Sequence, residues 1–202
     1  MISASQALQR LRAGNERFAD GNIDVATLEY DKLRKRLEEK QEPFAIVLGC
    51  SDSRVPVELV FGHGLGDLFV IRVAGNIVAP STIGSIEFAV QKFGTRLIVI
   101  LGHTGCGAIK ATLEALNMPG EQQSENLQFI VDQIRPAVER TVANANEHDP
   151  DALVSAIVRE NVRRSAEGQQ QGSEIIAQQV SEEGLMIVSA EYSLRSGKVE
   201  FF

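Results

Sequence analysis

The sequence predicts an α/β protein with an open, mainly parallel sheet of about four strands and flanking helices. Three short apolar runs (FAIVLG, LFVIRV and RLIVILG) are rich in β-branched residues and are bounded by glycine or polar residues. Such runs are typical of strands buried on both faces of a parallel sheet. Segments with helical spacing of apolar residues lie between them, and this alternation favours right-handed βαβ units.

Residues 1–43 are expected to form an N-terminal helical arm. Ala7, Leu8, Leu11 and Phe18 recur near helical spacing, which predicts an amphipathic helix. The charged run DKLRKRLEEK follows them and is typical of a solvated helix face.

Residues 44–118 contain the three apolar runs and form the predicted α/β core. Pro56 is suited to the first position of a short helix within PVELVF. A longer helix is expected to end at Gly94, because glycine is the common C-cap residue, and another is expected to follow Gly107.

Residues 119–202 are expected to form polar helical segments and then C-terminal strands. Pro136 is expected to start or kink a helix, the Asp149-Pro150 pair marks a break, and Ser173 is a suitable N-cap. The tail LMIVSAEY, SLRSG and KVEFF is typical of a strand, a turn and an additional edge strand. Because no linker or internal repeat is evident, the whole chain is expected to be one domain.

The composition argues against several classes of protein. Lysine and arginine number 20 and aspartate and glutamate 27, so the formal net charge is −7. This acidity argues against nucleic-acid or anionic-membrane partners. No apolar run approaches the roughly 18 residues of a spanning helix, and no signal-peptide pattern opens the sequence. A cytoplasmic protein is therefore expected.

Both cysteines and one of the three histidines lie in two short loops. Cys50 follows the first predicted strand, and His103 and Cys106 follow the third. Sites in open α/β sheets form beyond the carboxyl ends of strands, so these loops are expected to meet. Thiolate and imidazole are ligands that Zn²⁺ prefers, and three protein ligands leave a fourth position for water, as in catalytic zinc sites. Asp52 is also close enough in sequence to reach the metal.

These residues also have purely structural interpretations, which require no metal ion and no catalysis. Either cysteine alone is compatible with a small buried apolar residue, and the pair with a disulfide. Their grouping with His103 and Asp52 favours a metal site. His63 is expected to be an exposed loop histidine, with a proton-shuttle role as the alternative, and His148 is expected on the surface.

The motifs CSDSRVP, GDLFVIRVAGN, GSIEFAV and ILGHTGCGAIKA together resemble the β-class carbonic anhydrases, most closely over the predicted α/β core. The resemblance implies one zinc ion per chain, bound by Cys50, His103 and Cys106. It also implies a dyad of Asp52 and Arg54, and a homodimer or higher homo-oligomer.

The activity implied by the resemblance is reversible hydration of CO2 to bicarbonate and a proton by zinc-bound hydroxide. Asp52 would orient the hydroxide, and Arg54 would keep Asp52 ionised and away from the metal. One alternative is a carbonyl sulfide or carbon disulfide hydrolase on the same scaffold. Another is a non-catalytic, zinc-stabilised bicarbonate-binding protein, although such a protein would have no use for the dyad.

Some members of this family have a second, regulatory bicarbonate pocket made by a tryptophan, an arginine and a tyrosine. Arg72 and Tyr192 match the arginine and the tyrosine, but Val47 stands at the tryptophan position. The sequence therefore predicts a weak pocket. A salt bridge for Arg72 and strand packing for Tyr192 are the alternative roles.

Overall fold

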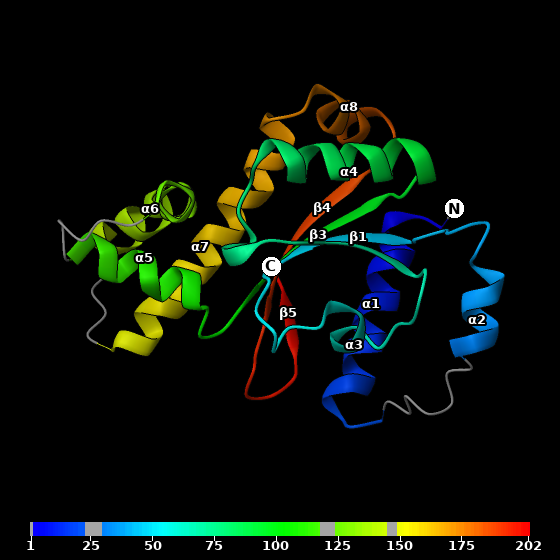
Figure 1. The fold of residues 1–202 in the computed structure, drawn as a ribbon, viewed down its shortest axis with the longest axis horizontal. Helices are drawn as coiled ribbons and strands as arrows, with labels where there is room; N and C mark the ends of the chain where they lie inside the picture. Colours follow the sequence, from blue (N-terminus) through cyan, green and yellow to red (C-terminus); the bar gives the residue numbers. More distant parts are fainter. Residues whose placement is uncertain (1, 23–29, 118–123, 145–148) are drawn as a thin grey trace.

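The computed structural model describes residues 2–22, 30–117, 124–144 and 149–202. Five strands in these ranges form one sheet in the order β2-β1-β3-β4-β5 (Figure 1). Strands β1 to β4 are parallel, and β5 pairs antiparallel with β4 at one edge, which confirms the predicted sheet and its additional strand. The strands are β1 (Ala45–Gly49), β2 (Leu68–Arg72), β3 (Leu97–His103), β4 (Met186–Tyr192) and β5 (Val199–Phe201).

Helices cover both faces of the sheet (Figure 1). Helices α4, α7 and α8 pack on one face, and α1 and α3 pack on the other. Helices α5 and α6 contact each other and α7, and their apolar residues pack in one cluster with Cys50, which directly follows β1. The helices are α1 (Ala4–Ala19), α2 (Tyr30–Arg36), α3 (Val57–Val60), η2 (Ala74–Asn76), α4 (Pro80–Phe93), α5 (Gly107–Asn117), α6 (Glu125–Asn144), α7 (Pro150–Gln171) and α8 (Glu174–Glu182).

The central strands β1 and β3 are buried along their whole length. In β1, Ile46 and Leu48 face the layer of α4, α7 and α8, and Val47 faces the layer of α1 and α3. Burial on both faces explains why these strands consist of continuous apolar runs rather than alternating apolar and polar residues.

Local signals in the sequence located several helix ends correctly. Gly94 ends α4 with a φ of 63°, the left-handed conformation that glycine adopts easily. The hydroxyl of Ser173 accepts a hydrogen bond from the Ile176 amide and caps α8. From the sequence, Pro136 is expected to start or kink a helix. The first alternative is wrong, because α6 begins at Glu125 and continues through the proline. Its buried apolar face compensates for the backbone hydrogen bond that proline cannot make.

The N-terminal helix is anchored to the rest of the domain. Leu11 of α1 is fully buried, as the apolar spacing predicts. Asn15 donates to the carbonyl oxygens of Val60 and Gly197 over 3.0 and 2.9 Å, and it accepts from the Val199 amide over 2.7 Å. One buried side chain thus ties α1 to α3 and to the turn between β4 and β5.

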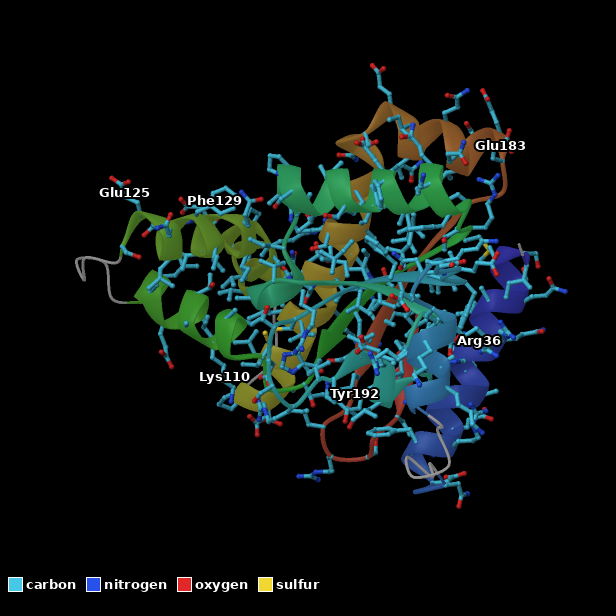
Figure 2. The ribbon with its side chains drawn as sticks, turned by 45° about the vertical axis from the view of Figure 1, so that its right-hand side comes forward. Arg36, Lys110, Glu125, Phe129, Glu183 and Tyr192 are labelled. Atoms are coloured by element: carbon cyan, nitrogen blue, oxygen red, sulfur yellow. The ribbon has the colours of Figure 1, made fainter. Side chains whose placement is uncertain are left out.

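Helix α6 lies on the outside of the molecule, and Figure 2 shows Glu125 and Phe129 on its outer side. The Phe129 side chain is 45% exposed. Within the described ranges, no helix combines the length and the apolar character needed to cross a membrane.

Candidate metal centre

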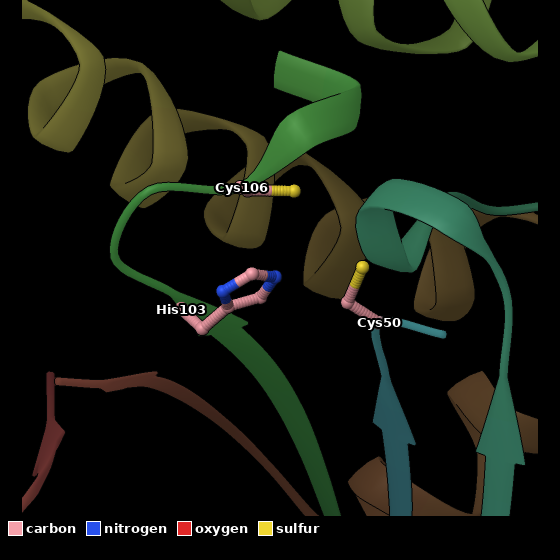
Figure 3. Close-up of side chains that lie close together, drawn as sticks. All are labelled: Cys50, His103 and Cys106. Atoms are coloured by element: carbon pink, nitrogen blue, oxygen red, sulfur yellow. The ribbon is translucent and has the colours of Figure 1, made fainter. Parts of the chain in front are cut away.

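The parallel pairing of β1 with β3 brings the two predicted loops together. Gly49 pairs with Leu101, so Cys50 emerges from the sheet beside the end of β3, where His103 is the last residue. Cys106 directly precedes α5. Figure 3 shows the three side chains converging from these segments, and their ligand atoms all lie within 4.8 Å of one another. All three residues are buried, with His103 fully inaccessible.

The hydrogen bonds of His103 identify the nitrogen that is free to bind a metal. Its Nδ1 lies 3.0 Å from the Thr104 carbonyl oxygen. A carbonyl can only accept, so Nδ1 carries the proton and Nε2 carries the lone pair. Nε2 is buried and has no hydrogen-bond partner among the described residues. An unpaired buried acceptor is costly, and a cation bound there would satisfy it, so this donor set fits a zinc ion.

The two cysteines influence each other's ionisation. Both are free thiols, so the disulfide alternative is wrong. The contact with Cys106 lowers the pKa of Cys50 to about 4, helped by the hydrogen bond from the Gly75 amide. The same contact, together with burial, raises the pKa of Cys106. One thiolate is therefore already favoured beside the imidazole nitrogen.

Asp52 and Arg54 form a bidentate ion pair next to the three donors. Arg54 Nε donates to Oδ1 over 2.9 Å, Nη2 donates to Oδ2 over 2.7 Å, and the Arg54 backbone amide also donates to Oδ1. The Arg54 contacts hold the pKa of Asp52 well below its usual range. Oδ2 lies 3.8 Å from His103 Nε2. The carboxylate is thus ionised, fixed by arginine and adjacent to the donor cluster.

The residues matched to the regulatory pocket lie on different strands. Arg72 ends β2 and donates to the backbone oxygens of Cys50 and Asp52 over 3.1 and 2.7 Å. Tyr192 ends β4 and is 5% exposed, and β1 and β3 separate it from β2. Val47 is fully buried in β1. Arg72 therefore contacts the loop that carries the candidate metal ligand Cys50 and the Asp52 carboxylate.

The prediction of an exposed His63 is wrong, because its side chain is only 13% exposed. The ring packs edge-on against Phe44, with centroids 4.8 Å apart, and Nδ1 lies 3.3 Å from Asp67 Oδ2. Phe44 precedes β1, so this histidine lies at the opposite end of that strand from Cys50 and is poorly placed for a proton shuttle. His148 lies outside the described residues.

Two further residues that the sequence analysis missed support this site, one in direct contact with Cys50 and the other behind it. The Gly75 amide donates to Cys50 Sγ over 3.4 Å, and the Asn161 side chain donates to the Gly75 carbonyl oxygen over 2.9 Å. The position of Gly75 just after β2, which pairs with β1, was a usable signal. Asn161 offered none, because it lies 86 residues away from Gly75.

The fold and the donor cluster define an α/β protein able to hold a metal ion at the carboxyl edge of its sheet. Residues 45–199 match the family model described as carbonic anhydrase. A carbonic anhydrase of Mycolicibacterium smegmatis is 36% identical over 198 residues, covering 96% of this chain and 91% of the relative.

Solved structures agree with this match. The β-carbonic anhydrase CafA of Aspergillus fumigatus superposes with a TM-score of 0.77 at 28% identity, covering 98% of this chain and 89% of that one. A tetrameric β-carbonic anhydrase of Sordaria macrospora gives a TM-score of 0.74 at 24% identity, with 98% and 95% coverage. The chain belongs to the β-class carbonic anhydrase family.

Proposed function

We propose that this protein is a carbonic anhydrase that reversibly hydrates CO2 to bicarbonate and a proton, with one zinc ion per chain held by Cys50, His103 and Cys106. The observation that carries the proposal is the cluster of three donors within 4.8 Å, flanked by the ion-paired Asp52 and Arg54. When bound, zinc supplies Lewis acidity that makes hydroxide available from water near neutral pH.

The chain's own residues position the reactants. Asp52 stays ionised because Arg54 lowers its pKa, so Oδ2 remains an acceptor for a hydrogen bond from the attacking water. That hydrogen bond orients the water's lone pair toward CO2. Arg54 occupies both carboxylate oxygens and keeps them from turning onto the donor cluster. Ile77 and Ile109 pack in the same cluster as the two cysteines and keep this region apolar.

The Asp52–Arg54 pair also supports an enzyme over a non-catalytic bicarbonate-binding protein, because a purely structural metal site needs no oriented carboxylate. A hydrolase of carbonyl sulfide or carbon disulfide would use the same donors and the same dyad. Only a comparison of substrates separates that activity from hydration of CO2.

We also propose a homo-oligomer in the cytoplasm. The tetrameric state of the Sordaria macrospora relative supports self-association. Leu65 and Phe88 are 45% and 51% exposed, and burying such apolar side chains against a second copy would be favourable. The two free thiols suit a reducing compartment.

The proposed function is tested by measuring zinc content and CO2 hydration on the same protein samples. Wild-type protein is expected to hold about one zinc per chain and to release protons rapidly from CO2 in a stopped-flow indicator assay. Cys106→Ala is expected to lose most of both. His63→Gln is the matched control, since it alters a largely buried histidine outside the cluster, and it should keep both.

Two results would contradict the proposed function. Full zinc occupancy in Cys106→Ala would refute the ligand assignment. A zinc-loaded wild-type protein that turns over carbonyl sulfide but not CO2 would replace the proposed reaction with the hydrolase alternative.

A further inference from the structure

A short helical turn, η2, lies directly beside Cys50 (Figure 3). Gly75 in this turn has a φ of 69°, and its amide donates to Cys50 Sγ over 3.4 Å. A Cβ at this position would lie 2.7 Å from Ile134 Cδ1 and 3.2 Å from Ala108 Cβ. The turn is therefore packed against α5 and α6, and only glycine brings the backbone amide this close to the sulfur without strain.

The carbonyl oxygen of Gly75 is held from the other side by helix α7. Asn161 Nδ2 donates to this oxygen over 2.9 Å, and the asparagine is only 4% exposed. A buried amide needs its hydrogen bonds, so the contact is costly to break. The amide and the carbonyl of Gly75 belong to successive peptide groups that meet at its Cα. The hydrogen bond to Asn161 holds the second group, and the packing of the turn against Ile134 and Ala108 limits rotation of the first, so together they set the direction in which the amide points.

We propose that Asn161 is a positioning residue for the metal centre: by holding the Gly75 carbonyl it keeps the Gly75 amide directed at the sulfur of Cys50. The inference rests on the proposed function, because it takes Cys50 as a metal ligand. An amide that donates to Cys50 Sγ fixes the sulfur where it can bind a metal, and it also draws some electron density from that sulfur. This hydrogen bond therefore helps to set the affinity of the donor cluster for metal and the electron donation from sulfur to metal.

The test compares Asn161→Leu and Asn161→Ala with wild-type protein. Leucine keeps most of the side-chain volume but cannot donate to the Gly75 carbonyl, and alanine removes both volume and donor. The matched control is Ser165→Ala, which deletes a buried hydroxyl one turn further along the same face of α7. Thermal unfolding of each variant separates a general loss of stability from an effect on the metal centre.

Two measurements report on the metal centre itself. Zinc affinity is obtained by competition with a chromophoric chelator, and both Asn161 variants are expected to bind zinc about 10- to 100-fold more weakly than wild type. In the Co²⁺-substituted protein, the sulfur-to-cobalt charge-transfer band should shift in the Asn161 variants. Ser165→Ala should match wild type in both measurements.

Wild-type zinc affinity and an unshifted cobalt band in both Asn161 variants would overturn the inference. If neither variant folds, the wild-type protein loaded with ¹¹³Cd decides the question by NMR. A scalar coupling between ¹¹³Cd and the Gly75 amide proton supports the hydrogen bond to the ligating sulfur, and its absence overturns the inference. Failure of the proposed function would show differently, as wild-type protein that does not bind zinc stoichiometrically.

Discussion

The loop from Cys50 to Asp52 is held through its backbone as well as its side chains. Arg72 donates to the carbonyl oxygens at both ends of this loop, over 3.1 and 2.7 Å. Arg54 holds the Asp52 carboxylate, and Gly75 contacts the Cys50 sulfur. Arg72 thus holds the backbone of both residues, whereas the Cys50 sulfur and the Asp52 carboxylate are held by separate groups. Mutation of Arg54 or of Gly75 can therefore affect one side chain without the other.

Replacing Arg54 tests the role of the ion pair. Arg54→Ala is expected to keep zinc and fold but to lose about 10- to 100-fold in CO2 hydration, because Asp52 loses its orientation. Arg54→Lys keeps the charge without the bidentate geometry and should fall between wild type and alanine. Stopped-flow rates with zinc analysis on the same samples measure both effects. Wild-type turnover in Arg54→Ala would contradict the mechanism.

At the scale of elements, the docking of α1 depends on close backbone contact. A Cβ at Gly14 would lie 1.8 Å from the Phe61 carbonyl oxygen. Such a clash with backbone cannot be relieved by a side-chain rotation. Helix α1 can approach the C-terminal end of α3 this closely only because residue 14 has no side chain.

Gly14→Ala is therefore expected to destabilise the fold by about 1–3 kcal/mol, the usual cost of overpacking. Gly84→Ala in α4 is the control, because a Cβ there would meet no heavy atom within 4 Å among the described residues outside its own stretch of helix. It should be neutral or stabilising by up to about 1 kcal/mol, since alanine favours helix. Urea unfolding measures both variants, and equal midpoints for the two would contradict the packing argument.

The segment before β2 contains a pH-dependent contact. The hydrogen bond with His63 lowers the pKa of Asp67, which also accepts from the Gly64 amide over 3.1 Å. A carboxyl with a lowered pKa in the folded state stabilises the fold above its unfolded pKa of about 4 and loses this effect as the pH falls.

Asp67→Asn is accordingly expected to lower the free energy of unfolding at pH 7 by no more than about 1 kcal/mol, because the side chain is 47% exposed. The difference from wild type should shrink between pH 5 and about pH 3. Urea titrations across this range measure it, and a difference that grows toward low pH would contradict the assignment.

At the scale of the whole molecule, the sheet order explains why the site forms where it does. The chain leaves β1 toward β2 on one side, and β3 lies on the other side of β1. The carboxyl ends of β1 and β3 therefore flank the point where the strand order reverses, which is where open α/β sheets bind their ligands. The site is a product of topology as well as of local motifs.

The same sheet order bears on regulation by bicarbonate. Arg72 already donates to two backbone oxygens, Val47 supplies no wide aromatic surface, and Tyr192 lies on β4. We expect added bicarbonate, at fixed ionic strength, to slow CO2 hydration by product inhibition without steepening the pH–rate profile or shifting it toward higher pH. Stopped-flow rates over pH 6.5–9 test this, and a steepened, shifted profile would show a working second pocket.

Several strands, helix ends and site residues of this protein could be predicted from short segments of the sequence. The apolar runs predicted β1 and β3, glycine and serine located helix ends, and the two short motifs contained all three residues that could hold a metal ion. These features depend on burial periodicity, capping and ligand chemistry, which are local properties of the chain. The apolar packing of α6 overrode the local signal of Pro136, because burial of a whole helix face outweighs one missing hydrogen bond.

Only the tertiary structure decided which distant residues meet. It placed Asn161 against Gly75 and buried His63 against Phe44. It also brought Arg72 within hydrogen-bond distance of the carbonyl oxygens of Cys50 and Asp52. Such contacts follow from strand order and helix packing, whose free energies are summed over the whole chain. A short segment of sequence does not reveal these packing free energies, because they depend on residues far away in the chain. The sequence therefore determined the chemistry of the site, and the tertiary structure decided its geometry.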